Sequence, residues 1–111
     1  MIRRLARLAE DARFSSRFWV ATPRGAIEVV VEYTGPFLVS FRSEDALIAW
    51  LNEVAREQPE AVSPYSVACL VAKAYSRALP GAPVRVAARG WGREAVAYGV
   101  NGVVVADANP N

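Results

Sequence analysis

The sequence predicts an α+β fold in which an antiparallel sheet carries two central helices packed on one face. Three observations lead to this class. Strand-like segments gather near both ends of the 111-residue chain, two helical segments occupy its middle, and Asn101-Gly102 marks a tight hairpin near the C-terminus. Strands grouped apart from helices are typical of α+β domains. The length and the lack of a linker-like stretch predict one domain over residues 1–111.

The first 14 residues are predicted to form a basic helix ahead of an α+β body over residues 16–107. Apolar residues recur in this segment at helical spacing, whereas Arg3, Arg4 and Arg7 lie on other faces. These arginines are either a solvated helix face or a surface that attracts phosphates. They also suit pairing with the acidic body of a neighbouring subunit.

Two strands and a turn are predicted next. Residues 16–22 form the first strand, Pro23-Arg24-Gly25 the turn, and residues 26–33 a second strand in which apolar and polar residues alternate. A short third strand is expected over residues 37–41. Together these segments would supply the N-terminal half of the sheet.

The first central helix is expected to start at Ser43, a suitable N-cap residue, and to end near Glu57, before Pro59. An apolar stripe at helical spacing predicts its buried face, which comprises Leu47, Trp50, Leu51 and Val54.

The second central helix is predicted over residues 64–79. Ser63-Pro64 opens it, because a proline at the first helical position loses no hydrogen bond. Apolar residues surround this helix, and only a narrow strip is polar. A helix of this kind is buried on more than one side. We therefore expect another subunit, or the N-terminal helix, to cover its outer side.

Three strands are predicted after Pro80, over residues 84–89, 94–100 and 103–107. Gly90-Trp91-Gly92 connects the first two of them, and Asn101-Gly102 connects the last two. The second connection is a strong sequence signal for a two-residue hairpin.

The composition excludes several classes of protein. A hydrophobic content of 53% with three Trp is that of a packed globule, and no apolar run approaches the length of a membrane span. One Cys and no His exclude an internal disulfide and leave no zinc-ligand set, so we expect a cytoplasmic protein without metal or cofactor. Lys73 is the one Lys among 13 basic residues, which indicates GC-rich coding or a thermophilic source.

Several strings resemble those of the tunnelling-fold (T-fold) superfamily. They are Ala21-Thr22-Pro23-Arg24-Gly25 before a Val-rich strand, Ser40-Phe41-Arg42, and Ser63-Pro64-Tyr65 at a helix entry. The chain is similar in this respect to the 7-cyano-7-deazaguanine reductases, the archaeal amidinotransferases related to them, and the type IB GTP cyclohydrolases. The resemblance covers about residues 16–100 and rests on order and spacing.

The resemblance implies a T-fold-like ββααββ body, a homo-oligomer, and a purine- or pterin-like ligand. Thr22 stands at or near the position of the family's catalytic Cys, and the closing hairpin at residues 89–94 has no His. Because thioimide chemistry needs a thiolate, the sequence indicates a catalytically divergent or inactive relative, with no catalytic residue assigned.

The expected ligand-binding residues are Glu94, Arg93, Trp91 and Thr22. In the family a glutamate holds the edge N–H groups of the heterocycle, and two donors on one edge suit the two oxygens of a carboxylate. For Glu94, a solvated strand residue is the alternative. Trp91 in a Gly-Trp-Gly turn suits either a ligand contact or packing on a neighbour.

Other readings remain open. The arginine helix with Arg3, Arg4 and Arg7, together with Trp91, supports a small nucleic-acid-binding protein. The missing catalytic set, together with the mostly apolar second helix, supports a structural subunit without a ligand. Cys69 in the second helix is expected to be a small buried hydrophobe rather than a nucleophile. Glu28 and Glu32 share one strand face, where solvated charges are favoured over a catalytic carboxylate pair.

Overall fold

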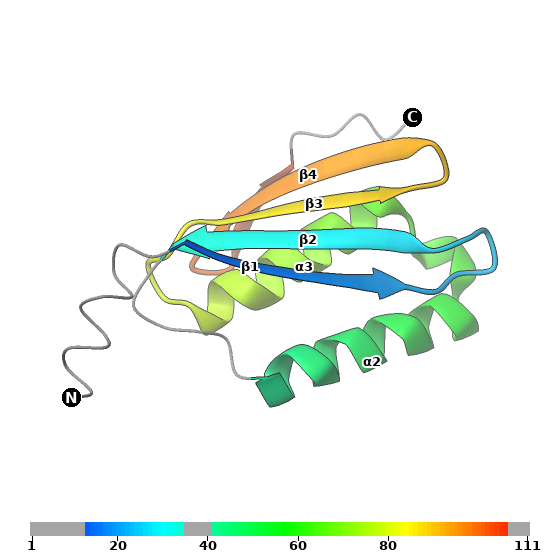
Figure 1. The fold of residues 1–111 in the computed structure, drawn as a ribbon, viewed down its shortest axis with the longest axis horizontal. Coiled ribbons are helices and arrows are strands. Elements are labelled where there is room, and N and C mark those ends of the chain that lie inside the picture. The colour runs from blue at the N-terminus through cyan, green and yellow to red at the C-terminus, as the bar shows by residue number, and fades with distance from the viewer. Residues whose placement is uncertain (1–12, 35–40, 107–111) are drawn as a thin grey trace.

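The structure is a computed structural model that describes residues 13–34 and 41–106 (Figure 1). Five antiparallel strands pair in the order β1-β2-β3-β4-β5, and two α-helices and a 3-10 turn, η1, lie between β2 and β3 in the chain. The strands are β1 (Arg13–Val20), β2 (Ile27–Thr34), β3 (Val84–Gly90), β4 (Arg93–Val100) and β5 (Val103–Ala106). The helical segments are α2 (Phe41–Glu57), η1 (Pro59–Ala61) and α3 (Pro64–Ala78).

The predicted α+β class is confirmed. Helix α3 packs against β2, β3, β4 and β5, whereas α2 packs against β1. The sheet lies in front of α3 in Figure 1, and α2 runs below β1. The sheet face away from α3 is called the open face below. The predicted helix at the N-terminus falls on residues 1–12, outside the described part of the chain.

The core lies between the sheet and the helices. Its largest fully buried side chains include Ile27, Leu51, Val71 and Tyr75. Strand β2 alternates as the sequence predicts, with Val29 and Val31 fully buried and Glu32 exposed. No helix among the described residues is long and apolar enough to cross a membrane.

Strand β1 starts three residues before the predicted position. Phe14, Phe18 and Val20 point toward the helices, but Ser16 interrupts this apolar row. The reason is a long-range polar contact, because Ser16 Oγ donates a hydrogen bond of 2.8 Å to Glu44 Oε2 on α2. Ser16 therefore interrupts the alternation of apolar and polar residues that would have extended the predicted strand toward Arg13. Its hydrogen-bond partner, Glu44, is 28 residues away in the sequence.

Two expectations for the first central helix are wrong. Helix α2 begins at Phe41, so Ser43 lies inside it rather than at its N-cap, and Phe41 is not in a strand. Residues 37–40 of the expected third strand lie outside the described residues.

Trp50 on α2 is 47% exposed rather than buried. Because α2 packs along an edge strand, only a narrow stripe around Leu51 is fully covered.

Helix α3 begins as predicted. Ser63 Oγ accepts a hydrogen bond of 3.1 Å from Ser66 N, and Ser66 Oγ accepts one of 2.9 Å from Ser63 N, which is a reciprocal capping box. Pro64 occupies the first turn. On the outer side of α3, Leu70 and Ala74 are only partly buried, so the expectation that a further subunit covers this side stays a prediction.

Gly99 on β4 allows α3 to lie close to the sheet. A Cβ atom at Gly99 would stand 2.8 Å from Ala72 O and 2.8 Å from Ser76 Oγ. Ser76 Oγ also accepts a hydrogen bond of 3.0 Å from Gly102 N in the next turn. The helix and the β4–β5 hairpin are therefore joined at a point where only glycine fits.

The two C-terminal hairpins have the predicted tight turns. Asn101 and Gly102 have φ values of 52° and 82°, and Trp91 and Gly92 have values of 59° and 74°. Positive φ at both central residues is the requirement of a type I′ turn, which matches the twist of the flanking strands. Asn101 Oδ1 also accepts a hydrogen bond of 2.8 Å from Gly81 N.

A buried polar contact attaches α2 to the rest of the molecule. Tyr75 on α3 is 1% exposed, and its hydroxyl donates a hydrogen bond of 2.5 Å to Glu44 Oε2. This oxygen also accepts the bond from Ser16, so one carboxylate links β1, α2 and α3. Burial, followed by the hydrogen bond to Glu44, raises the pKa of Tyr75 well above its usual range.

Candidate functional site

The turns of the β1–β2 and β3–β4 hairpins lie at one end of the sheet, at the right in Figure 1. In the first turn Gly25 N donates a hydrogen bond of 3.0 Å to Thr22 O. Thr22 Oγ1 donates to Gly25 O at 2.6 Å and accepts from Arg24 N at 3.1 Å. The Thr22 side chain therefore closes its own turn, which is a structural role that its hydroxyl fulfils without a catalytic base.

Trp91 joins the two hairpin turns. Its Nε1 donates a hydrogen bond of 3.3 Å to Gly25 O, although 66 residues separate the two positions. The Arg24 guanidinium carbon stands 4.4 Å from the centroid of the indole ring. The ring is also packed against the core. Trp91 is therefore held in place, and its contribution to a site is to position the turns rather than to swing onto a ligand.

A hollow of about 360 Å³ lies beside Thr22, between the first hairpin turn and α2. It is lined by Ala21, Thr22, Pro23, Asn52 and Arg56. Asn52 Oδ1 accepts a hydrogen bond of 2.8 Å from Ala21 N, which fixes the hairpin to the helix. Sequence reasoning missed Asn52 and Arg56. Their spacing of four residues, which places two polar side chains on one helix face, was the available signal.

Arg93 and Glu94 begin β4 at the same end of the sheet as Trp91. Arg93 pairs in register with Gly90, and Glu94 pairs with Arg89. The Glu94 Oε2 atom accepts a hydrogen bond from Arg89 Nε, which raises the pKa of Arg89. The structure thus brings the four predicted ligand-binding residues to one end of the sheet, but Glu94 lies on the open face whereas Thr22 lines the hollow beside α2.

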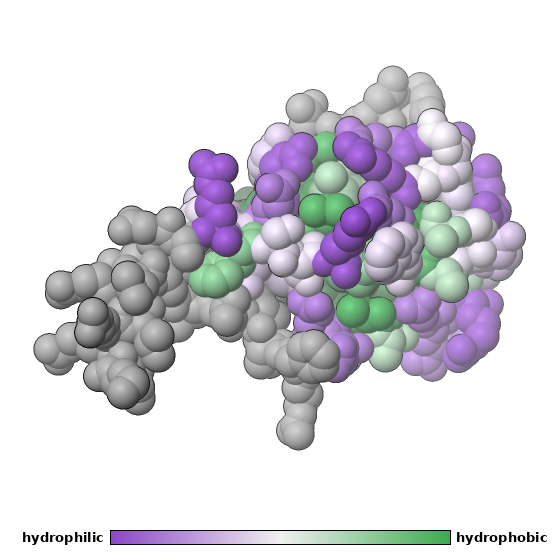
Figure 2. All heavy atoms as spheres, viewed as in Figure 1, coloured by the Kyte–Doolittle hydropathy of each residue, from purple (hydrophilic) through white to green (hydrophobic). Residues whose placement is uncertain are grey.

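The open face combines paired charges with an apolar row. Three cross-strand ion pairs lie on it, formed by Arg17 with Glu28, Arg85 with Glu32, and Arg89 with Glu94. Figure 2 shows the result as purple charged side chains separated by green apolar ones. Glu28 and Glu32 therefore pair with arginines rather than with one another.

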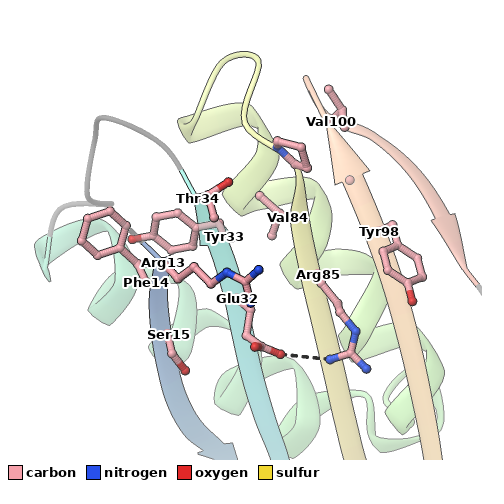
Figure 3. Close-up of a pocket in the computed structure, with 12 residues that line it drawn as sticks. Arg13, Phe14, Ser15, Glu32, Tyr33, Thr34, Val84, Arg85, Tyr98 and Val100 are labelled. Atoms are coloured by element: carbon pink, nitrogen blue, oxygen red, sulfur yellow. Dashed lines mark hydrogen bonds and ion pairs between the residues drawn. The ribbon is translucent and has the colours of Figure 1, made fainter. Parts of the chain in front are cut away.

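A second hollow, of about 330 Å³, lies on the open face at the opposite end of the sheet (Figure 3). It crosses from the start of β1 to the end of β4. Arg13, Glu32, Thr34, Arg85, Tyr98 and Val100 are among the residues that line it, and it is called the open-face hollow below. No sequence motif marked these residues, since they come from four strands and only the register brings them together.

Cys69 on α3 is partly buried and packs against the core. Burial raises the pKa of its thiol, an effect that a hydrogen bond with Tyr65 opposes. This environment is that of a small hydrophobe rather than an activated nucleophile.

We expect Cys69 in the folded protein to react with iodoacetamide more slowly than the same thiol in urea-unfolded chain at pH 8. A raised pKa leaves less thiolate at this pH, and burial restricts access. The measurement is the rate of alkylation by mass spectrometry over a pH series. Labelling of the folded protein as fast as that of the unfolded chain would restore an enzymatic role for the thiol.

Within the described ranges, no group of three or more Cys, Asp or Glu side chains lies close enough to hold a metal ion. Arg3, Arg4 and Arg7, the expected nucleic-acid contacts, fall outside these ranges. Comparison with protein-family models, with curated proteins and with solved structures finds no match to the chain.

Proposed function

We propose that this chain is a subunit of a homo-oligomer that binds a planar heterocycle of the purine or pterin class at the hairpin-turn end of its sheet. We further propose that the body is T-fold-like and catalytically divergent or inactive. The order β1, β2, α2, α3, β3, β4, with neighbours in sequence also neighbours in the sheet, supports the ββααββ arrangement.

The observation that carries the proposal is the link between the two hairpin turns. Trp91 donates to Gly25 and lies under Arg24, so the turns form one rigid end of the sheet. A rigid end holds nearby side chains in fixed positions, which reduces the entropy lost when a ligand binds. Glu94 is the predicted ligand residue that this end of the sheet carries on the open face, whereas Thr22 lines the hollow beside α2.

Glu94 suits the donor edge of a guanine- or pterin-type ring. Its side chain is 45% exposed, and Oε2 is the oxygen that Arg89 engages. A carboxylate offers two oxygens with several acceptor positions, so the pair with Arg89 leaves acceptor capacity for two N–H groups. Arg89 at the same time compensates the negative charge of the site.

Assembly is supported by the two edges that the sheet has within the described residues, β1 and β5. Trp19 on β1 is 53% exposed, and Val103 and Val105 on β5 are 71% and 67% exposed. Unpaired strand edges with exposed apolar side chains favour pairing with another chain. These edges also support the alternative of an interaction subunit without a ligand.

The paired charges on the open face argue against nucleic-acid binding by the described part of the chain. Arg17, Arg85 and Arg89 each pair with a glutamate, which leaves little uncompensated positive charge for phosphates. That alternative therefore rests on Arg3, Arg4 and Arg7, which lie outside the described residues, and on Trp91, whose indole contacts Gly25 and Arg24.

We expect guanine, 7-deazaguanine or pterin to raise the melting temperature of the wild-type protein. A ligand at about 100 times its Kd stabilises the folded state by about 2.7 kcal/mol. Glu94→Gln should reduce this shift, because the substitution replaces an acceptor oxygen with a donor group. A thermal-shift series over ligand concentration measures both effects.

Glu32→Gln is the matched control for this series. It changes the same kind of cross-strand pair, with Arg85, but at the opposite end of the open face. The control should keep the wild-type shift. A melting temperature that none of the three ligands changes, or an equal loss in the two variants, would contradict the proposed site.

A further inference from the structure

We propose that the open-face hollow is a second binding site, which takes a small planar aromatic molecule carrying one anionic group. An aromatic carboxylate is the simplest member of this class. The site lies at the end of the sheet away from Trp91 and Gly25, so it is separate from the site of the proposed function.

The shape of the hollow suits one small molecule. Its volume of about 330 Å³ lies at the lower end of the range typical of small-molecule sites, roughly 300–1,000 Å³. Strands β1 to β4 supply all the lining residues except Pro83, which lies in the loop before β3, so most of the wall is part of a hydrogen-bonded sheet. A site on strands is held more accurately than one on a flexible segment.

The charges that line the hollow favour a single anionic group. Arg85 Nη1 stands 3.0 Å from Glu32 Oε1, so these two side chains compensate one another. Among the described residues no ion-pair partner of Arg13 is found, which leaves one positive charge in excess. In Figure 3 the Arg13 side chain crosses β2 toward β3, so its guanidinium lies over the hollow. A guanidinium binds carboxylates through paired hydrogen bonds.

The opposite wall of the hollow favours an aromatic ring. Tyr98 and Val100 on β4 are 45% and 41% exposed, and both side chains border the hollow in Figure 3. A planar ring that covers Tyr98 gains an aromatic contact together with the burial of apolar surface. Thr34, also at the hollow, adds a hydroxyl that can donate to the ligand. An anion without a ring would leave this wall uncovered, and a neutral ring would not engage Arg13.

The test is a titration of the labelled protein with three probes, followed by the amide signals in NMR spectra. The probes are 4-hydroxybenzoate, its neutral analogue 4-hydroxybenzamide, and acetate, which has no ring. The amides of Ser15, Thr34 and Gly99 report on the hollow, whereas those of Gly25 and Gly92 report on the hairpin turns. We expect saturating shifts at the first group with 4-hydroxybenzoate, at a Kd of about 1 mM or tighter.

Arg13→Gln should weaken binding of 4-hydroxybenzoate about tenfold, as expected for the loss of a charge-assisted hydrogen bond. Arg17→Gln is the matched control, because Arg17 lies on the same strand and face but outside the hollow. It makes the same change in net charge and should leave the affinity unaltered.

Five outcomes would overturn the proposal. The first three are equal binding of the amide and the acid, equal binding of acetate, and an Arg13→Gln protein with wild-type affinity. The other two are shifts that do not saturate, and shifts that occur only at Gly25 and Gly92. The last outcome would leave the hairpin-turn site standing, so a failure here is distinguishable from a failure of the proposed function.

Discussion

Gly99→Ala is expected to destabilise the protein by about 2–3 kcal/mol, the upper part of the range for overpacking a core. The new Cβ would stand 2.8 Å from Ala72 O, a backbone atom in the middle of α3, and 3.1 Å from Ser76 Cβ. Neither neighbour is the end of a flexible side chain, so α3 must move away from β4. Urea denaturation followed by circular dichroism measures the loss.

Gly81→Ala separates this packing effect from the general effect of replacing a glycine. Gly81 has a φ of +79°, but no atom lies within 4 Å of the position of its Cβ. Its substitution should therefore cost only the strain of a left-handed backbone, about 1 kcal/mol. A Gly99→Ala protein that loses no more stability than Gly81→Ala would show that the close approach of α3 is not required.

Glu44→Leu is expected to cost a similar amount, about 2–3 kcal/mol, because it leaves two donors without their acceptor. The Tyr75 hydroxyl is fully buried, and both it and Ser16 Oγ donate to Glu44 Oε2. Glu44→Gln keeps an acceptor oxygen and should cost clearly less. Denaturant unfolding and hydrogen exchange of the α2 amides measure the effect on stability and on this helix.

A double-mutant cycle tests whether the carboxylate acts through Tyr75. Once Glu44 is Leu, Tyr75→Phe removes an unsatisfied donor rather than a hydrogen bond. The double variant should therefore lose less stability than the sum of the two single variants. Strictly additive losses would mean that the contact between Glu44 and Tyr75 contributes nothing to the attachment of α2.

The sequence predicted elements whose signals are local. The capping box at Ser63 and the Asn101-Gly102 turn need only neighbouring residues, and both occur as expected. The start of β1 could not be predicted because Ser16 interrupts the apolar row of the strand. Its hydroxyl donates a hydrogen bond to Glu44 on α2, which the local sequence does not reveal. The exposure of Trp50 was missed because a helix stripe does not reveal whether the helix crosses the centre or the edge of a sheet.

For the candidate sites too, local features could be predicted from the sequence and long-range contacts could not. The turn around Thr22 could be located from Pro23 and Gly25, but the link from Trp91 to Gly25 joins residues 66 positions apart. The pairing of Glu94 with Arg89 follows from the tight turn between β3 and β4, and was predictable in principle once Gly90-Trp91-Gly92 was assigned as a turn. The open-face hollow was not predictable, since it depends on the register of four strands.

The two proposed sites use the two ends of one face in different ways. At the hairpin-turn end, Glu94 would accept hydrogen bonds from a ring edge, with Arg89 compensating its charge. At the other end, Arg13 would hold an anion while Glu32 and Arg85 compensate one another. The opposite chemistry of the two ends means that variants of one should leave the other unchanged.

Native mass spectrometry of the protein, as purified and after addition of guanine or pterin, tests the central claim most directly. It measures the number of chains in the assembly and the mass of any bound molecule in the same spectrum. The account predicts a dimer or larger assembly that gains the mass of one heterocycle for each chain, with the gain reduced in Glu94→Gln. A spectrum that contains only the 12.0 kDa chain, with no added mass at any ligand concentration, would contradict it.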